Sequence, residues 1–308
     1  MRAVIVRSFG GPEVLEIAEV AVPSPGPGQV RIRVAAAAVN PVDWATRAGY
    51  LTAFSAERSV TGIGWDVAGV IDAVGPGVTG FAAGDRVIGL SDLVDKALGT
   101  YAEFAVLDAD AVALAPESAS LAEAATLPLN GLTALQALDL LDRPHGTLLV
   151  TGAAGGLGGF VTELAATRGY HVVGTARASD EAFVRSLGAK DFIPREAELG
   201  PAARALFPGG VDIVIDAAAL GIGAHAALRG GGTFVAVTTP ATPPPLRGTR
   251  VVNVWIRADD PRLADLVSLV DKGSLTLRVA AGYPLEQAGE AQERLMAGGV
   301  RGRLVLEP

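Results

Sequence analysis

The sequence predicts an α/β protein in which a doubly wound parallel sheet is joined to a second, β-rich domain. Residues 1–114 hold short strand-like runs separated by turns rich in glycine and proline, which is typical of an antiparallel β domain. From about residue 120, strand-like and helical runs alternate, which indicates a parallel sheet covered by helices. The 308 residues, of which 50% are hydrophobic, suffice for two separate cores.

The first third of the chain predicts a curled β-sheet. Residues 2–20 are expected to form two strands around a GGPE turn, and the PSPGPG segment (23–28) is a stiff connector that cannot continue a ladder. Residues 29–40 alternate and then become continuously small and apolar, as a strand that enters a core would. Further strands are expected at 67–74, 85–90 and 101–107.

The later part of the chain predicts helices and six more strands. The segment from Leu121 is helical apart from a break at Pro128. Strand-like runs then lie at 147–151, 171–175, 191–193, 211–216, 233–238 and 250–256. Helical segments and one strand, GRLVLEP, close the chain, and we expect them to fold back onto the first domain. The predicted domains are therefore 1–114 with 259–308, and 115–258.

Composition excludes several classes of function. A net charge of −8 and a pI of about 5.0 argue against nucleic-acid binding, which depends on Lys and Arg neutralising phosphates. The absence of cysteine excludes disulfides, thiolate catalysis and cysteine-based zinc sites. No apolar run approaches the ~20 residues of a membrane span, and no apolar signal-peptide core follows the N-terminus. We therefore expect a cytoplasmic protein without membrane partners.

A glycine cluster, AAGGLGG at 153–159, lies between an apolar strand and a helical segment. Ala153, Gly155 and Gly158 take the three positions of a GxGxxG fingerprint inside a βαβ unit of roughly 30 residues, the context that a Rossmann-type dinucleotide site requires. An ordinary glycine-rich turn is the alternative. The residues expected to bind the pyrophosphate are Gly152, Ala153, Ala154, Gly155, Gly156, Leu157 and Gly158.

The stretch GTARASD (174–180) favours NADP(H). An NAD site usually carries Asp or Glu here for the ribose 2′-hydroxyl, whereas an NADP site supplies a cation. Ala176 and Arg177 stand where the acid is expected, so Arg177 would pair with the 2′-phosphate, and Arg195 would add a second cation. The alternative is a solvated surface arginine, and the nearby Asp180 and Glu181 add opposing charge.

Several segments, in order, resemble the medium-chain dehydrogenase/reductase superfamily, and specifically its zinc-independent NADPH:quinone oxidoreductase branch. They are VNPVDWATRAGY (39–50), GWDVAGVI (64–71), GDRVIGL (84–90), GTYAEFAV (99–106), AATLPLNGLTALQAL (124–138), TGAAGGLG (151–158) and GRLVLEP (302–308). The resemblance implies a GroES-like catalytic domain beside the Rossmann-type domain. It also implies a homodimer formed through the edge strand RVVNVWI (250–256).

The zinc ligands of related alcohol dehydrogenases are replaced in this chain. Their Cys and His positions carry Asn40 and Trp65, neither of which is an effective substitute, so no metal site is expected. Asn40 would instead lie beside the nicotinamide or a substrate carbonyl and donate its amide N–H, unless it only caps the turn before Pro41. Tyr50 would polarise a carbonyl or supply a proton, with a packing role as the equal alternative.

Further cofactor contacts are implied by the resemblance. Thr126 and Thr133 would approach the nicotinamide or the phosphates, unless their hydroxyls bond only within their helices. Thr175 would hold the adenosine end together with Arg177, and the backbone near Val237 would meet the carboxamide.

The leading hypothesis is an NADPH-dependent, zinc-independent reductase that transfers hydride to a small-molecule quinone or α,β-unsaturated carbonyl. Such reduction needs hydride placement and support for a developing oxyanion, whereas alcohol oxidation needs a Lewis acid or a base. One alternative is an enoyl-thioester reductase, although no basic cluster for an acyl carrier is present. The other is a non-catalytic NADPH-binding sensor, RNA-binding or structural protein. Loops 51–64 and 91–100 are expected to set specificity.

Overall fold

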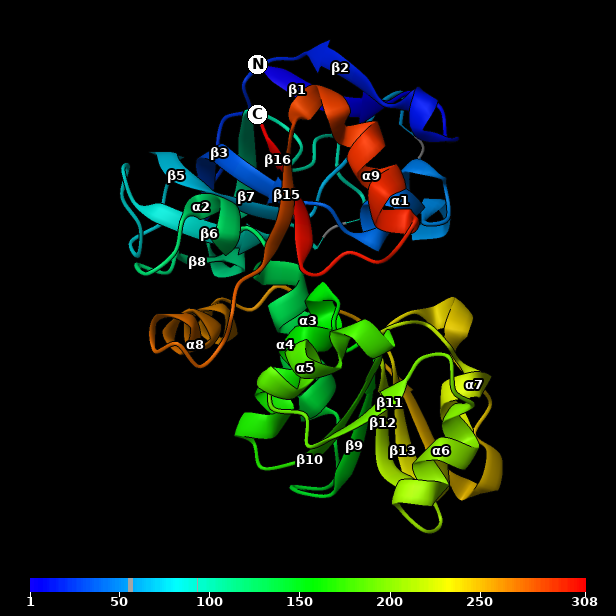
Figure 1. Cartoon of the computed structure of the whole chain (residues 1–308). Coiled ribbons are helices and arrows are strands. Elements are labelled where there is room, and N and C mark those ends of the chain that lie inside the picture. The colour runs from blue at the N-terminus through cyan, green and yellow to red at the C-terminus, as the bar shows by residue number, and fades with distance from the viewer. Residues whose placement is uncertain (55–57, 93) are drawn as a thin grey trace. The chain divides into compact units, whose positions relative to one another are not determined.

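The computed structural model describes residues 1–54, 58–92 and 94–308. The chain divides into two compact units: unit 1 comprises Met1–Leu132 and Arg257–Pro308, and unit 2 comprises Thr133–Ile256 (Figure 1). Residues 115–132 lie in unit 1, whereas the sequence-based division assigns them to the second domain. The sequence-based domain boundaries stay a prediction. The α/β class and the doubly wound parallel sheet are confirmed.

The sheets of unit 1 are antiparallel, as the alternating segments predict, except that the last two strands of the chain pair parallel. A small sheet has the order β2 (Glu16–Glu19), β1 (Arg2–Val6) and β4 (Thr61–Gly62). The larger sheet runs β15 (Val279–Pro284), β16 (Arg303–Glu307), β3 (Gln29–Ala38), β5 (Asp66–Val74), β6 (Arg86–Leu90) and β8 (Val112–Leu114), with β7 (Phe104–Asp108) also paired to β3. The terminal strand β16 pairs with β3 at Val305 and Ala38, so the chain's end returns to this unit.

Short helices cover the sheets of unit 1. The α-helices are α1 (Pro41–Arg47), α2 (Leu121–Ala124), the first residues of α3 (Pro128–Asp139), α8 (Asp260–Asp271) and α9 (Ala288–Met296). Single 3₁₀ turns lie at η1 (Pro12–Val14), η2 (Thr52–Phe54), η3 (Ala109–Ala111) and η7 (Leu285–Gln287). The break expected at Pro128 is confirmed: the proline starts α3, a position where its missing N–H is not needed.

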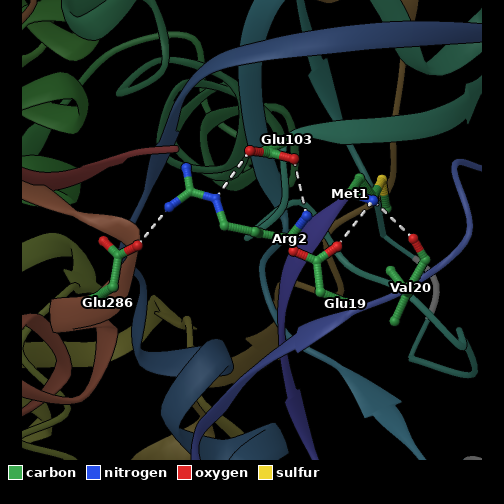
Figure 2. Close-up of polar contacts among 6 residues, drawn as sticks. All are labelled: Met1, Arg2, Glu19, Val20, Glu103 and Glu286. Atoms are coloured by element: carbon green, nitrogen blue, oxygen red, sulfur yellow. Dashed lines mark hydrogen bonds and ion pairs between the residues drawn. The ribbon is translucent and has the colours of Figure 1, made fainter.

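Arg2 joins segments that lie far apart in the sequence (Figure 2). Its backbone N–H and Nε donate to the two carboxylate oxygens of Glu103 at 2.8 and 2.9 Å, and Nη1 donates to Glu286 at 2.5 Å. Glu103 precedes β7 and Glu286 lies in η7. Arg2 therefore links β1 to the start of β7 and to η7. The side chains are part-exposed, so the network fixes register more than it adds stability.

Unit 2 is a parallel sheet with helices between its strands. The strand order is β11 (Asp191–Pro194), β10 (His171–Ala176), β9 (Thr147–Thr151), β12 (Val211–Asp216), β13 (Leu228–Ala236) and β14 (Arg250–Asn253). The helices are the rest of α3, α4 (Gly156–Thr167), α5 (Glu181–Ser186), α6 (Leu199–Leu206) and α7 (Ile222–His225), with 3₁₀ turns η4 (Ala178–Asp180), η5 (Thr239–Ala241) and η6 (Leu246–Gly248).

The order of these strands reverses between β9 and β12, which are adjacent in the sheet although β10 and β11 intervene in the chain. In open parallel sheets, ligands bind outside the carboxyl ends of the strands at such a switch point. The predicted glycine loop follows β9 at this place. None of the helices in the described ranges is long and apolar enough to cross a bilayer.

Candidate active site

The glycine loop begins one residue after β9. Gly152 has φ +62°, a left-handed conformation that glycine adopts without strain, and its carbonyl accepts a hydrogen bond from Gly155 N at 2.9 Å. Gly155 is the N-cap of α4. A Cβ on Gly158 would lie 2.2 Å from the Gly152 oxygen, so only glycine lets α4 approach the loop this closely. The N-terminus of α4 therefore lies directly against the loop, and helix N-termini favour anions such as a pyrophosphate.

Asp216 supports this edge of the sheet and was not identified from the sequence. Its Oδ1 accepts from the Thr151 hydroxyl at 2.6 Å, and its two oxygens accept from the backbone N–H groups of Leu220 and Gly221 at 3.1 and 2.7 Å. Thr151 in turn accepts from Ala218 N at 2.9 Å. The ends of β9 and β12 are thereby fixed to each other. The sequence does indicate this residue: Asp216 is the acid at the end of the apolar strand VDIVID, and the structure shows that it is buried.

At the end of β10, two polar groups are available to a ligand. The hydroxyl of Thr175 is buried and has no hydrogen-bond partner among the described residues. Arg177 is exposed, and its guanidinium makes no ion pair or hydrogen bond within the described ranges. Arg195 is exposed and pairs with Glu196 at 3.2 Å, so it is less free. An unpaired Thr175 hydroxyl, with the exposed Arg177 two residues further on, fits the adenosine 2′-phosphate of a dinucleotide.

Three further predicted cofactor residues are Thr126, Thr133 and Val237. The Thr126 hydroxyl donates to Glu123 O at 2.7 Å, which is the helix-local bond that the sequence left open as its alternative. Thr133 is buried in α3, and Val237 is half-buried directly after β13. Their contacts with a nucleotide stay predictions.

Asn40 is the centre of a buried polar cluster in unit 1. Its Nδ2 donates to Asp66 Oδ2 at 2.8 Å, and its Oδ1 accepts from Asn130 Nδ2 at 3.1 Å. Its backbone N–H donates to Asp43 Oδ2 at 2.7 Å. The side chain therefore bridges β5 and α3, while the carboxyl of Asp43 caps the start of α1. Asn40, Asp43, Asp66 and Asn130 are all fully buried.

Asp66 accepts two hydrogen bonds, one on each oxygen. Besides the Asn40 amide, the backbone N–H of Leu129 donates to Oδ1 at 2.6 Å at the start of α3. Burial raises the pKa of this carboxyl to about 7, and the hydrogen bonds and the charge of Arg303 oppose the rise. Arg303 is itself buried and donates to Asn130 Oδ1. Burial lowers its pKa to about 10.

Tyr50 lies outside this cluster. It is 67% exposed, and its ring lies 5.2 Å from the ring of Trp44. The phenol that does lie in the cluster is that of Tyr101, which donates to Asp43 Oδ2 at 2.9 Å. Burial raises the pKa of Tyr101 well above its ordinary value, so this phenol stays protonated. A catalytic role for Tyr50 stays a prediction.

Lys96 is a further charged residue that sequence reasoning missed. Its Nζ donates to Gly64 O at 2.8 Å, to Ser91 O at 3.1 Å and to Ser91 Oγ at 3.0 Å. It also lies 5.0 Å from the centre of the Trp65 ring, a cation–π distance. Burial lowers the pKa of Lys96, against the opposing charges of Asp43, Asp92 and Asp66.

The comparisons with known proteins cover the whole chain. Residues 26–117 match the alcohol dehydrogenase GroES-like domain, and residues 187–306 match the zinc-binding dehydrogenase family. The chloroplast envelope quinone oxidoreductase homolog of Arabidopsis thaliana is 30% identical over all of this chain and 98% of its own length. The chain belongs to the medium-chain dehydrogenase/reductase superfamily.

Within that superfamily it is an oxidoreductase of the quinone oxidoreductase branch. The quinone oxidoreductase from Coxiella burnetii superposes with a TM-score of 0.89 at 30% identity, covering 100% of this chain and 99% of that one. The NADPH-dependent alkenal/one oxidoreductase of Arabidopsis thaliana is 31% identical over 100% of this chain and 80% of its own length. The resemblance and the GroES-like fold expected from the sequence are confirmed, and a pyridine nucleotide is the cofactor that fits the glycine loop.

The zinc that the superfamily implies does not fit the residues of this member. Both polar atoms of the Asn40 side chain are engaged by Asp66 and Asn130, and the indole of Trp65 offers no lone pair. Within the described ranges, no three His, Cys, Asp or Glu side chains gather as a metal centre requires.

Proposed function

We propose that this protein is an NADPH-dependent, zinc-independent reductase that transfers hydride from the nicotinamide to a quinone or an α,β-unsaturated carbonyl. The observation that carries the proposal is the Asn40 amide, held by hydrogen bonds at the position where zinc-dependent relatives carry a ligand. Without a Lewis acid, oxidation of an unactivated alcohol lacks a group that manages the hydroxyl proton. Electron-poor acceptors need only hydride placement and support for the oxygen that gains charge.

The proposal is tested by following NADPH oxidation against quinones, enones, an enoyl-thioester and, in reverse, simple alcohols with NADP⁺. We expect turnover of a quinone or enone that survives treatment with a chelator and gains nothing from added zinc. Tight NADPH binding without consumption of any acceptor would contradict the reductase proposal and favour the sensor alternative. Turnover of the thioester alone would favour the enoyl-thioester reductase.

Preference for NADPH is proposed to depend on Arg177. Its exposed guanidinium has no partner in the described ranges, and no acid follows β10 directly. Replacing Arg177 with Ala should raise the KM for NADPH about 10- to 100-fold, since hydrogen bonds to charged groups contribute about 1.5–3 kcal/mol each. The KM for NADH should stay nearly constant. Steady-state kinetics with both nucleotides measure the two values.

The matched control is Arg185→Ala, because Arg185 is also exposed but is already paired with Glu181 at 2.8 Å. It should leave the KM for NADPH unchanged. Equal use of NADH and NADPH by the wild type would show that Arg177 does not set the preference.

A homodimer is proposed through β14. This strand is one of the two edges of the unit 2 sheet in the described ranges, and Trp255, just beyond it, is 65% exposed. Open apolar edges invite pairing with another copy. Sedimentation should give twice the 31.2 kDa chain mass, and Trp255→Lys should shift it toward the monomer. A monomeric wild type at micromolar concentration would contradict this proposal.

A further inference from the structure

Ser91 lies at the end of the β5–β6 strand pair that also carries Trp65. β5 and β6 are antiparallel, with Asp66 opposite Leu90, so the residues next to that pair are Trp65 and Ser91. The backbone N–H of Ser91 donates to Trp65 O at 2.8 Å and extends the pairing by one step. By the resemblance, Trp65 stands where zinc-dependent relatives place their histidine ligand, which puts Ser91 beside a residue of the expected acceptor site.

The hydrogen bonds of Lys96 determine what the Ser91 hydroxyl can do. Lys96 Nζ donates to Ser91 Oγ at 3.0 Å, and its other two donors meet Ser91 O and Gly64 O. The hydroxyl oxygen of Ser91 is thus an acceptor from Lys96, while its own proton has no acceptor in the described part of the chain. Ser91 is half-buried, whereas the ammonium of Lys96 is enclosed by its three acceptors and the Trp65 ring. The Ser91 hydroxyl is therefore a hydrogen-bond donor whose oxygen accepts a hydrogen bond from the Lys96 ammonium.

Charged groups on four segments surround Lys96. The carboxyls that act on it are Asp43 of α1, Asp66 of β5 and Asp92 in its own loop. Asp43 and Asp66 are held by Asn40, and Asp92 accepts from Ala258 N at 2.6 Å, where the chain re-enters unit 1. The cation of Arg303 in β16 acts on the same two buried carboxyls. The hydrogen bonds of Lys96 fix its position. Burial lowers its pKa and the three carboxyls only partly oppose this, so Lys96 can release its proton near neutral pH.

We propose that Ser91 is the proton donor of the reduction and that Lys96 positions and recharges it. This inference rests on the proposed reductase function. Hydride from NADPH adds to the β-carbon of an enone, or to a quinone, and an electron pair moves onto the carbonyl oxygen. The Ser91 O–H bond breaks, and its proton goes to that oxygen. A Lys96 N–H bond then breaks to restore the Ser91 hydroxyl, and the neutral amine takes up a proton from water. One hydride and one proton are added in all: the enol formed from an enone tautomerises to the saturated carbonyl, and a quinone becomes a hydroquinone.

The first test removes the hydroxyl. Ser91→Ala should lower kcat for the enone or quinone about 100-fold or more, the range typical of general acid catalysis, with the Kd of NADPH unchanged. The size of the solvent deuterium isotope effect on kcat should also change, because water must then supply the proton directly. Ser91→Thr keeps a hydroxyl and should retain most of the rate, which distinguishes proton donation from a packing role.

The second test uses pH. A lysine whose pKa is lowered to about 7 is protonated below that pH, so wild-type kcat should fall as pH rises through about 7. Lys96→Arg keeps the charge but cannot release a proton near neutrality, so its rate should be low and lack this inflection. Lys96→Met should be equally slow, whereas Lys272→Met, at the exposed end of α8, should match the wild type. Carbon-13 NMR of the lysine ε-methylenes reports the Lys96 titration without turnover.

The outcomes separate this inference from the proposed function. A wild type that reduces no quinone or enone overturns the function itself. A wild type that is active, with Ser91→Ala and Lys96→Met keeping its rate and its pH profile, overturns the inference alone.

Discussion

Replacing Gly158 with alanine is expected to abolish measurable binding of the nucleotide cofactor. The new Cβ would lie 2.2 Å from the carbonyl oxygen and 2.7 Å from the carbonyl carbon of Gly152, distances that no rotamer change relieves because both partners are backbone. The loop and the start of α4 must separate, which displaces the backbone that is predicted to bind the pyrophosphate. Hydrogen bonds to charged groups contribute about 1.5–3 kcal/mol each, so losing two raises the Kd at least about 100-fold. Fluorescence titration with NADPH measures the change.

Gly223→Ala is the matched control for this substitution. Gly223 is also a helical glycine of unit 2, but an added Cβ there meets nothing within 4 Å. Alanine in that helix should leave the Kd unchanged and raise stability by up to about 1 kcal/mol. An unaltered Kd in Gly158→Ala would show that the nucleotide does not bind along this loop.

Local patterns in the sequence predicted the glycine loop and its supporting sheet. The alternation of apolar strands and helices placed six strands near their observed positions, and the loop at 153–159 follows the central strand as expected. These features depend on residues that are near one another in the chain. The two largest differences are in the last two strands: β13 spans Leu228–Ala236 instead of 233–238, and β14 ends at Asn253 although the apolar run continues to Ile256.

The polar cluster of unit 1 could not be predicted because its members are distant in the sequence. Asn40 bonds a residue 26 positions away in β5 and one 90 positions away in α3, and Arg303 reaches Asn130 across 173 positions. Periodicity identifies a buried strand but does not say which acid faces which amide. Lys96 was missed for a related reason: its partners, Ser91 and Gly64, lie in irregular segments next to strands, where no residue pattern indicates which groups meet.

The same cluster gives the second large expected effect. Asp66→Ala should destabilise unit 1 by about 3–5 kcal/mol, the usual cost of removing one partner from a buried charged network. The Asn40 amide and the Leu129 N–H would lose their acceptor, and the buried Arg303 would lose a counter-charge. Urea unfolding measures the change, and in a Trp255→Phe background the fluorescence of Trp44 and Trp65 reports unit 1 alone.

The pH dependence of that unfolding isolates the carboxyl itself. Burial raises the pKa of Asp66 to about 7, above the value near 4 of an unfolded aspartate, so the folded chain binds the proton more tightly. This group therefore lowers stability as pH rises from about 4 to about 7, and Asp66→Ala should remove that slope. Asp72→Ala, on the same strand but in a part-exposed pair with Arg31, should cost at most about 1 kcal/mol. If the two substitutions lowered the free energy of unfolding equally, the hydrogen bonds of the buried cluster would contribute no more to stability than a part-exposed ion pair.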